Sequence, residues 1–328
     1  MSEPLPKTYG QGGNVLPAND GTPLQQAVRG VRPRVDTKTV IDYGNLPAPV
    51  KYEELQREAL MSLKPELFEG FRFDLTKSLN QNFALAHSFF LGNIDVPTNN
   101  NQPIKMAIGT YEFGANYVTS QGTMLIGRMT NDGRMTGRIK HDLTPSISLK
   151  SQMQLASEAG MSQAMVDIDF KGKDWNSQIK YGSNDFYGIN YFQSVTPSFS
   201  MGGEAFWLGQ QRKSGTGFAA RHQGEQHVAT CQLATTGLIN ATYIHKVNEK
   251  LSLATDFLWN WHGREATASF GYDYMVRQCR LRGKVDTDGK VGALLEERIN
   301  VGVNFVLSAE IDHPKKDYKF GFGMTLGE

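Results

Sequence analysis

Residues 265–274 alternate between polar or small and apolar or aromatic side chains at every position: Glu265-Ala266-Thr267-Ala268-Ser269-Phe270-Gly271-Tyr272-Asp273-Tyr274. A period of two is typical of a β-strand with one apolar face, because successive side chains of a strand point to opposite faces. The same period begins near Phe68 and continues to the end of the sequence. Further examples are residues 71–76, 147–154, 300–308 and 319–326.

Turn signals separate these alternating stretches. Asn131-Asp132-Gly133 and Asp286-Thr287-Asp288-Gly289 are typical of the tight connections in β-hairpins. A central strand excludes proline, because each of its residues must donate a backbone hydrogen bond. The five prolines after residue 70 all fall between alternating stretches: Pro97, Pro103, Pro145, Pro197 and Pro314. The region is therefore predicted to be a chain of β-hairpins.

The length of the strands favours a membrane barrel over a soluble β-protein. A strand of about 10 residues, tilted near 45°, rises roughly 23 Å, close to the apolar band of a membrane barrel. At roughly 13 to 14 residues per strand and turn, the region holds about 19 strands, although an even 18 also fits the count. A soluble sandwich or propeller is the alternative, but no blade repeat of 40 to 50 residues is present. We therefore predict an all-β transmembrane barrel of about 19 strands.

The first 66 residues have a different character. Eight of the 13 prolines lie within the first 70 residues, and residues 1–50 have the composition of a flexible Pro/Gly-rich tail. Residues 51–66 are predicted to contain a short helix with Leu55, Ala59 and either Ser62 or Leu63 on one face, and residues 67–328 form the barrel. The spacing of this helix leaves open whether it packs on a soluble domain or inside a barrel.

Composition excludes several functional classes. With 34 Lys+Arg against 33 Asp+Glu, the formal charge of +1 gives no attraction to nucleic acid. Mean hydropathy is −0.41 and no apolar stretch approaches 18 residues, which argues against a helical membrane protein. Two cysteines are too few for a disulfide framework. No secretory signal is recognisable, so we expect a barrel made in the cytosol and inserted from there.

No motif predicts an enzyme, a cofactor or a metal site. Residues 215–220 match a dinucleotide-binding pattern, but they follow a polar run and no helix is predicted after them. His222 and His227, with Cys231 nearby, match no zinc spacing, and Gly224 between them is typical of a turn.

The alternation places charged side chains together on the face opposite the apolar one. If the apolar face meets lipid, these charges must face a water-filled lumen. They are candidate contacts for a passing polypeptide, but they could equally do no more than solvate the wall. The candidates are Asp167, Asp169, Arg138, Lys140, Arg280, Arg282 and Lys284.

Two stretches resemble the channel-forming subunits of the translocase of the mitochondrial outer membrane. Residues 67–71 and 85–92 are similar to the opening strands of that family. Residues 319–326 fit the sorting signal of mitochondrial barrels, polar-x-Gly-x-x-hydrophobic-x-hydrophobic, through Lys319, Gly321, Met324 and Leu326. The voltage-dependent anion channels share this signal.

The resemblance implies 19 strands closed by a parallel pair, with the short helix inside the lumen. It further implies location in the mitochondrial outer membrane, contact with membrane lipid and self-association of barrels. A tail-anchored receptor subunit and several small single-helix subunits are the implied partners. No cofactor is implied.

A 19-stranded barrel would be about 38 Å across at the backbone and about 25 Å clear, wide enough for a helix about 10 to 12 Å thick. The first functional hypothesis is a protein-conducting channel for unfolded precursor proteins. An anion-channel-type porin for metabolites and ions is the alternative, and a soluble β-scaffold without a channel is a third.

Overall fold

The computed structural model describes residues 46–96, 104–120, 122–158 and 160–327. The tail predicted for residues 1–50 therefore lies mostly outside the described residues. Among the described helices, none is both long enough and apolar enough to cross a membrane.

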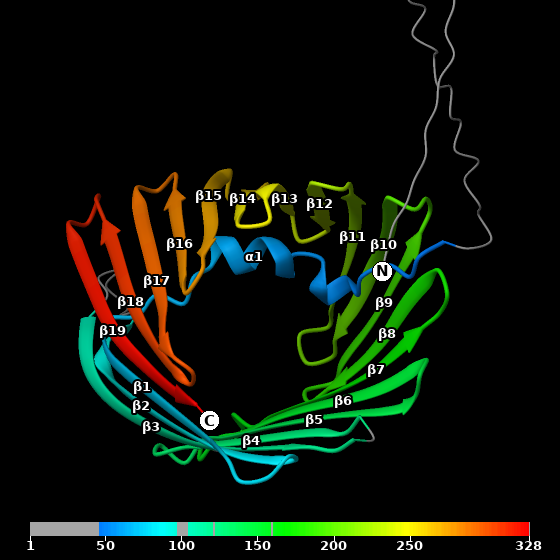
Figure 1. The fold of residues 1–328 in the computed structure, drawn as a ribbon. Coiled ribbons are helices and arrows are strands. Elements are labelled where there is room, and N and C mark those ends of the chain that lie inside the picture. Colours follow the sequence, from blue (N-terminus) through cyan, green and yellow to red (C-terminus); the bar gives the residue numbers. More distant parts are fainter. Residues whose placement is uncertain (1–45, 97–103, 121, 159, 328) are drawn as a thin grey trace, which may run out of the picture. The chain divides into compact units, whose positions relative to one another are not determined.

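Nineteen strands form one closed sheet (Figure 1). Each strand pairs antiparallel with its sequence neighbours, and β1 closes the barrel by pairing parallel with β19, with Gly70 opposite Gly321. The prediction of about 19 strands and a parallel closing pair is thus confirmed. The strands are β1 Gly70–Ser78, β2 Phe83–Val96, β3 Ile104–Val118, β4 Met124–Thr130, β5 Met135–Thr144, β6 Ile147–Leu155, β7 Gln163–Lys171, β8 Trp175–Gly182, β9 Phe186–Ser194, β10 Phe199–Leu208, β11 Lys213–Gln223, β12 His227–Ala234, β13 Leu238–Asn248, β14 Leu251–Asn260, β15 Glu265–Val276, β16 Cys279–Asp286, β17 Lys290–Asn300, β18 Val303–Asp312 and β19 Asp317–Gly327.

The direction of the strands defines two edges of the barrel. We call the edge at which β1 begins the start edge, and the edge at which β1 ends the end edge. Because neighbours run antiparallel, every odd-numbered strand begins at the start edge, and every even-numbered strand begins at the end edge.

A helical segment precedes the barrel and lies inside it. It consists of the 3-10 helix η1 (Tyr52–Glu54) and the α-helix α1 (Arg57–Leu63), so the single predicted helix is divided at Leu55 and Gln56. The chain leaves the helix before Pro65, which cannot continue it. We refer to residues 46–69 as the internal segment.

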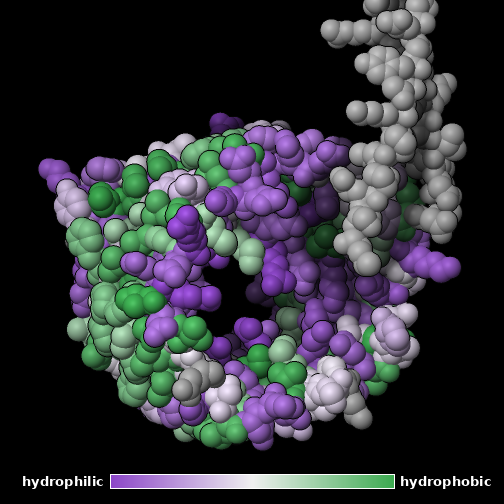
Figure 2. Space-filling view, in the orientation of Figure 1, coloured by the Kyte–Doolittle hydropathy of each residue, from purple (hydrophilic) through white to green (hydrophobic). Residues whose placement is uncertain are grey.

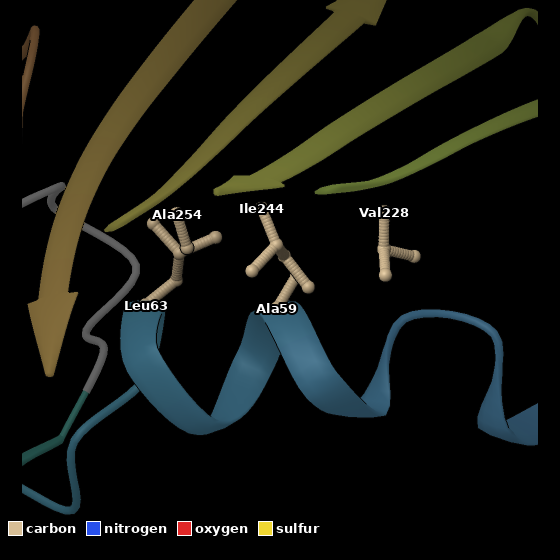
Figure 3. Packing of buried hydrophobic residues seen from close by; sticks show 5 residues of the cluster. All are labelled: Ala59, Leu63, Val228, Ile244 and Ala254. Atoms are coloured by element: carbon tan, nitrogen blue, oxygen red, sulfur yellow. The ribbon is translucent and has the colours of Figure 1, made fainter. Parts of the chain in front are cut away.

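The apolar core lies between the internal segment and one side of the wall. Ala59 and Leu63 of α1 pack on Val228, Ile244 and Ala254 of β12 to β14 (Figure 3). Leu55 and Tyr52 pack on Phe192 and Ala219 in a second cluster. The predicted helix face of Leu55, Ala59, Ser62 and Leu63 is therefore the buried one.

These contacts fix which face of every strand points inward. Phe192, Ala219, Val228, Ile244 and Ala254 face the internal segment, and the pairing register carries that orientation to the remaining strands by alternation.

One stretch that was predicted as a single strand is divided between two strands in the structure. The stretch 300–308 was expected to be continuous, but β17 ends at Asn300 and β18 begins at Val303. Gly302 has a φ of 86°, and Val301 at the turn is 96% exposed. The alternation continues through this two-residue turn, so the pattern alone does not reveal it.

Candidate functional site

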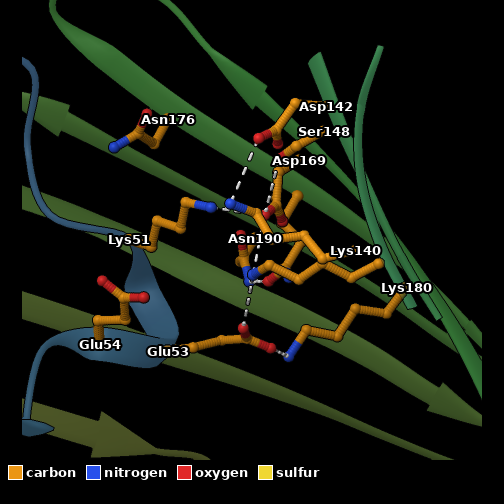
Figure 4. Close-up of polar contacts among 12 residues, drawn as sticks. Lys51, Glu53, Glu54, Lys140, Asp142, Ser148, Asp169, Asn176, Lys180 and Asn190 are labelled. Carbon is orange, nitrogen blue, oxygen red and sulfur yellow. Dashed lines mark hydrogen bonds and ion pairs between the residues drawn. The ribbon is translucent and has the colours of Figure 1, made fainter. Parts of the chain in front are cut away.

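The lumen carries the charged side chains that the sequence places on one face. Register puts Asp167 and Asp169 of β7 inward, with Lys150 of β6 opposite Asp167 and Ser148 opposite Asp169. Lys51 of the internal segment approaches Asp169 to 2.6 Å, and Lys150 approaches it to 2.9 Å. Asp169 is therefore buried within an ion cluster, with 6% of its side chain exposed (Figure 4).

Asp167 sits beside this cluster without sharing its bonds. Lys180 lies opposite Asp167 on β8. One carboxylate oxygen of Asp167 is buried without a hydrogen-bond partner. Each of the two carboxylates keeps one buried oxygen without a hydrogen-bond partner, but Asp169 is ion-paired with Lys51 and Lys150 through its other oxygen.

Glu53 links η1 to the same region of the wall. Its carboxylate pairs with Lys180, and Lys150 lies 3.9 Å away. Burial tends to raise the pKa of Glu53, but the hydrogen bond and charge of Lys180, helped by Gln178 and Lys150, hold this pKa below its ordinary value. At pH 7 the carboxylate is charged and anchors the segment.

Tyr52 makes the neighbouring polar contact of η1. Burial, followed by the charge and hydrogen bond of Glu204 on β10, raises the pKa of Tyr52 well above its usual range. The phenol is therefore neutral, and its ring meets Phe192 edge-on at 6.3 Å between centroids.

Arg221 of β11 holds the junction between η1 and α1. Only 3% of its side chain is exposed, and it donates to the Leu55 carbonyl at 3.2 Å and to Glu58 at 3.0 Å. The sequence analysis did not select Arg221, although its inward position follows from the alternation of residues 213–223.

The predicted basic positions are inward and spread over two separate regions. Arg138 and Lys140 lie on β5, and Lys140 is 3.4 Å from Asp142. On the opposite side of the internal segment, Arg280 pairs with Asp273 at 2.6 Å and Arg282 pairs with Glu296. These two arginines help to line a cavity of about 960 Å³ beside α1.

Lys284 completes the basic run of β16. It lies 2.8 Å from Asp286 and belongs to neither the Arg280 pair nor the Arg282 pair. The structure thus places Asp167 beside the ion cluster of Asp169, puts Arg138 and Lys140 two strands away on β5, and holds the β16 triplet elsewhere.

The sorting-signal residues all lie on β19, the strand that closes the barrel. Lys319 and Gly321 face inward, whereas Met324 and Leu326 face outward. At Gly321 an added Cβ would clash with the Phe68 carbonyl and would lie 2.6 Å from the Phe68 ring. Glycine is thus required for the close approach of the internal segment, apart from any role in sorting.

The outward face is apolar and carries aromatic side chains near both edges. Those near the start edge are Tyr181, Tyr187, Trp207, Trp259 and Tyr318. Those near the end edge are Tyr117, Trp175, Tyr191 and Tyr274. Two aromatic girdles around an apolar band are typical of a transmembrane barrel.

The rejected motifs lie in ordinary hairpins. Residues 215–220 form part of β11, and Gly224 lies in the turn between His222 and His227, whose rings are 5.4 Å apart. Within the described part of the chain, no three His, Cys, Asp or Glu side chains are arranged to hold a metal ion.

Comparison with known proteins identifies the family. The model of the eukaryotic porin family matches residues 48–321. The chain belongs to the eukaryotic porin family. It is 52% identical to an Arabidopsis thaliana protein named probable mitochondrial import receptor subunit TOM40-2, over 92% of this chain and 97% of that protein.

More distant relatives also align with most of the chain. A Homo sapiens protein named mitochondrial import receptor subunit TOM40 homolog is 28% identical over 87% of this chain and 80% of its own length. A Neurospora crassa protein named mitochondrial import receptor subunit tom40 is 25% identical over 83% of this chain and 80% of its own. Among solved structures, a Rhodopseudomonas blastica porin mutant superposes with a TM-score of 0.47 at 10% identity, over 75% of this chain and 96% of that one.

Proposed function

We propose that this chain forms the protein-conducting channel through which unfolded precursor proteins cross the mitochondrial outer membrane. The observation that carries the proposal is the 52% identity, over nearly the whole length of both chains, to a relative named as a mitochondrial import receptor subunit. The distant relatives quoted above carry the same name, which favours this function over the anion-channel alternative.

The geometry is compatible with a polypeptide as cargo. A closed barrel of 19 strands is about 38 Å across at the backbone, and the internal segment lies against one side of it. Figure 2 shows an opening beside that segment, bordered by hydrophilic side chains. An extended chain, or a helix about 10 to 12 Å thick, is narrow enough for such a lumen.

The lumen charges are proposed as the contacts of the passing chain. Asp167 and Asp169 would attract the basic residues of a presequence, and Arg138, Lys140, Arg280, Arg282 and Lys284 would contact acidic segments. Because Lys51 already pairs with Asp169, a basic segment of the cargo would compete with Lys51 for that carboxylate. Conduction requires such sites to be weak enough to release the chain.

The partners of the barrel are proposed on the same basis. An import complex would supply a tail-anchored receptor subunit and small single-helix subunits against the outward face, together with further copies of the barrel and membrane lipid. We propose no cofactor and no enzymatic activity.

Single-channel recording on the full chain in lipid bilayers tests this function. A synthetic basic presequence peptide is expected to block the current reversibly, and the same peptide with its basic residues replaced by Gln is expected not to. Conductance that both peptides leave unchanged would contradict a protein-conducting channel and favour the metabolite porin.

A further inference from the structure

The hairpin of β2 and β3 is longer than the adjacent strands β1 and β4 and extends past both at the start edge. β2 pairs with β1 only as far as Gly92, and β3 pairs with β4 only from Glu112. Residues 93–96 and 104–107 continue to pair with each other past these limits. We call residues 104–111 of β3 the overhang, which is about 26 Å long.

The overhang leaves one row of backbone groups without a partner strand. The Asn131 N–H donates to the Tyr111 carbonyl, so the backbone of Tyr111 points toward the β4 side. Alternation then directs the backbone groups of Gly109, Ala107 and Lys105 to that same side, whereas the even residues bond to β2. The Asn131 side chain caps the Gly109 carbonyl at 3.3 Å, and no described residue bonds to the backbone at Ala107 or Lys105 on this side.

The overhang must lie outside the hydrocarbon layer. Unpaired backbone groups are too costly in lipid, so an open edge is found only where water or protein can satisfy it. The charges at its base agree with this position, because Lys105 approaches Asp317 of β19 to 2.7 Å and Glu69 to 3.5 Å. Asn93 also donates to Glu69 at 2.8 Å, so these contacts tie the hairpin to β19 and to the internal segment at the start edge.

The side chains of the overhang suit an extended polypeptide. Met106, Ile108 and Thr110 share the face that continues the lumen side of β3, and Met106 is 55% exposed. Ala107 and Gly109 on the other face are small, so they leave the backbone accessible. An open edge next to exposed apolar side chains is the arrangement that binds an extended peptide as an added strand.

We propose that the overhang binds an extended segment of an unfolded precursor as an additional β-strand at the mouth of the channel. This proposal rests on the proposed function, which supplies the occupant, because extended chains are the cargo of the channel. Recognition through the backbone requires no particular sequence, which suits a channel that must accept many precursors. The five groups offered are the amides of Lys105, Ala107 and Gly109 and the carbonyls of Lys105 and Ala107.

Residue-resolved hydrogen exchange on the full chain in lipid nanodiscs tests the pairing. The probe is an unfolded, presequence-bearing precursor fused to a tightly folded domain that arrests it in the channel. We expect exchange to slow at least tenfold at Lys105, Ala107 and Gly109, and to stay unchanged at Met106, Ile108 and Thr110, which already bond to β2.

A pair of variants separates backbone pairing from side-chain contact. Ala107→Pro removes the free amide without removing a bond to β2, and Ala107→Val retains that amide. A photoreactive group at Met106 should crosslink to the arrested precursor about tenfold less in the proline variant than in the valine variant. Equal crosslinking in the two variants, with both barrels correctly assembled, would overturn the proposal.

The remaining outcomes also decide the question. A precursor held in the lumen without the alternating protection refutes strand addition and leaves the import function intact, whereas a precursor that is never held refutes both. Protection that is present without precursor and rises with protein concentration would assign the edge to a second copy of the chain. Protection without precursor that disappears on deletion of residues 1–45 would assign it to the protein's own N-terminal region.

Discussion

Lys51 and Asp169 form an ion pair between the internal segment and the wall at a proposed cargo site. Lys51 is 31% exposed on its side chain, whereas Asp169 is 6% exposed, so the lysine is the partner that a basic segment could displace. The carboxylate would keep Lys150 during such an exchange.

Replacing Lys51 with Gln is therefore expected to strengthen the binding of a basic presequence peptide. Removal of a competing, partly solvated ion pair corresponds to about 1 kcal/mol, or roughly a fivefold lower Kd. Fluorescence titration of a labelled peptide measures this change, and Lys140→Gln serves as the control because Lys140 pairs with Asp142 instead. Weaker binding to the Lys51 variant would mean that the lysine positions the site and does not compete for it.

Glu53 makes the anchoring of η1 dependent on pH. Because the pKa of the folded state lies below the ordinary value of 4.5, the anchor is fully present above that value and is lost as the pH falls through the lowered pKa. The Lys180→Gln variant keeps Glu53 buried but removes its principal charge partner. The pKa of Glu53 should then be higher, so the internal segment should be released from the wall at a higher pH.

A fluorophore attached at the partly exposed position 54 reports this release. The labelled chain carries Glu54→Cys together with Cys231→Ser and Cys279→Ser, and emission is followed from pH 7 to pH 3. If the emission changes at the same pH in the labelled chain and in its Lys180→Gln variant, Glu53 does not control the attachment of η1 to the wall.

At the scale of elements, Gly70 and Gly321 face each other at the seam where β1 pairs with β19, and each lies against a close neighbour. Gly70 has a φ of 113°, and its added Cβ would lie 2.6 Å from the Gly92 backbone, while Gly321 is covered by Phe68. These contacts come from residues far apart in the sequence, so the glycines are required by tertiary packing and not by a local turn.

Gly321→Ala is expected to destabilise the seam by about 1 to 3 kcal/mol, the usual cost of forcing an extra carbon into a packed site. Gly137→Ala is a matched control, because an added Cβ at Gly137 meets nothing within 4 Å. Resistance of the refolded barrel to heat in detergent measures the difference without the insertion machinery. Equal heat resistance of the Gly321→Ala and Gly137→Ala variants would mean that glycine at position 321 serves only the sorting signal.

The wall could be predicted from the sequence far better than the contents of the lumen. Alternation such as that of residues 265–274 is a local property, and it fixes which charges share a face. The pairing of Asp169 with Lys51 spans 118 positions, and no local pattern reports that separation. The overhang was missed for a similar reason, since it arises from unequal lengths of neighbouring strands and not from the sequence of β3.

At the scale of the whole molecule, the described contacts of the internal segment begin at Pro47, whose carbonyl accepts from Ser194 at 2.7 Å. A chain lacking residues 1–45 retains every one of these contacts. We expect it to assemble into a detergent-stable barrel with the thermal resistance of the full chain, measured by native electrophoresis after heating. If the shortened chain fails to assemble, residues 1–45 are required for folding of the barrel.

The odd number of strands has a consequence for where the chain ends. With odd parity, the wall begins at the start edge with Gly70 and finishes at the end edge with Gly327. The internal segment runs back through the lumen from the end edge to the start edge. Pro47 contacts the last residue of β9 at the end edge, whereas Phe68 contacts Ser308 and β19 near the start edge. Residue 46 and residue 327 therefore open onto the same compartment, and a protease confined to the opposite side of the membrane would find neither.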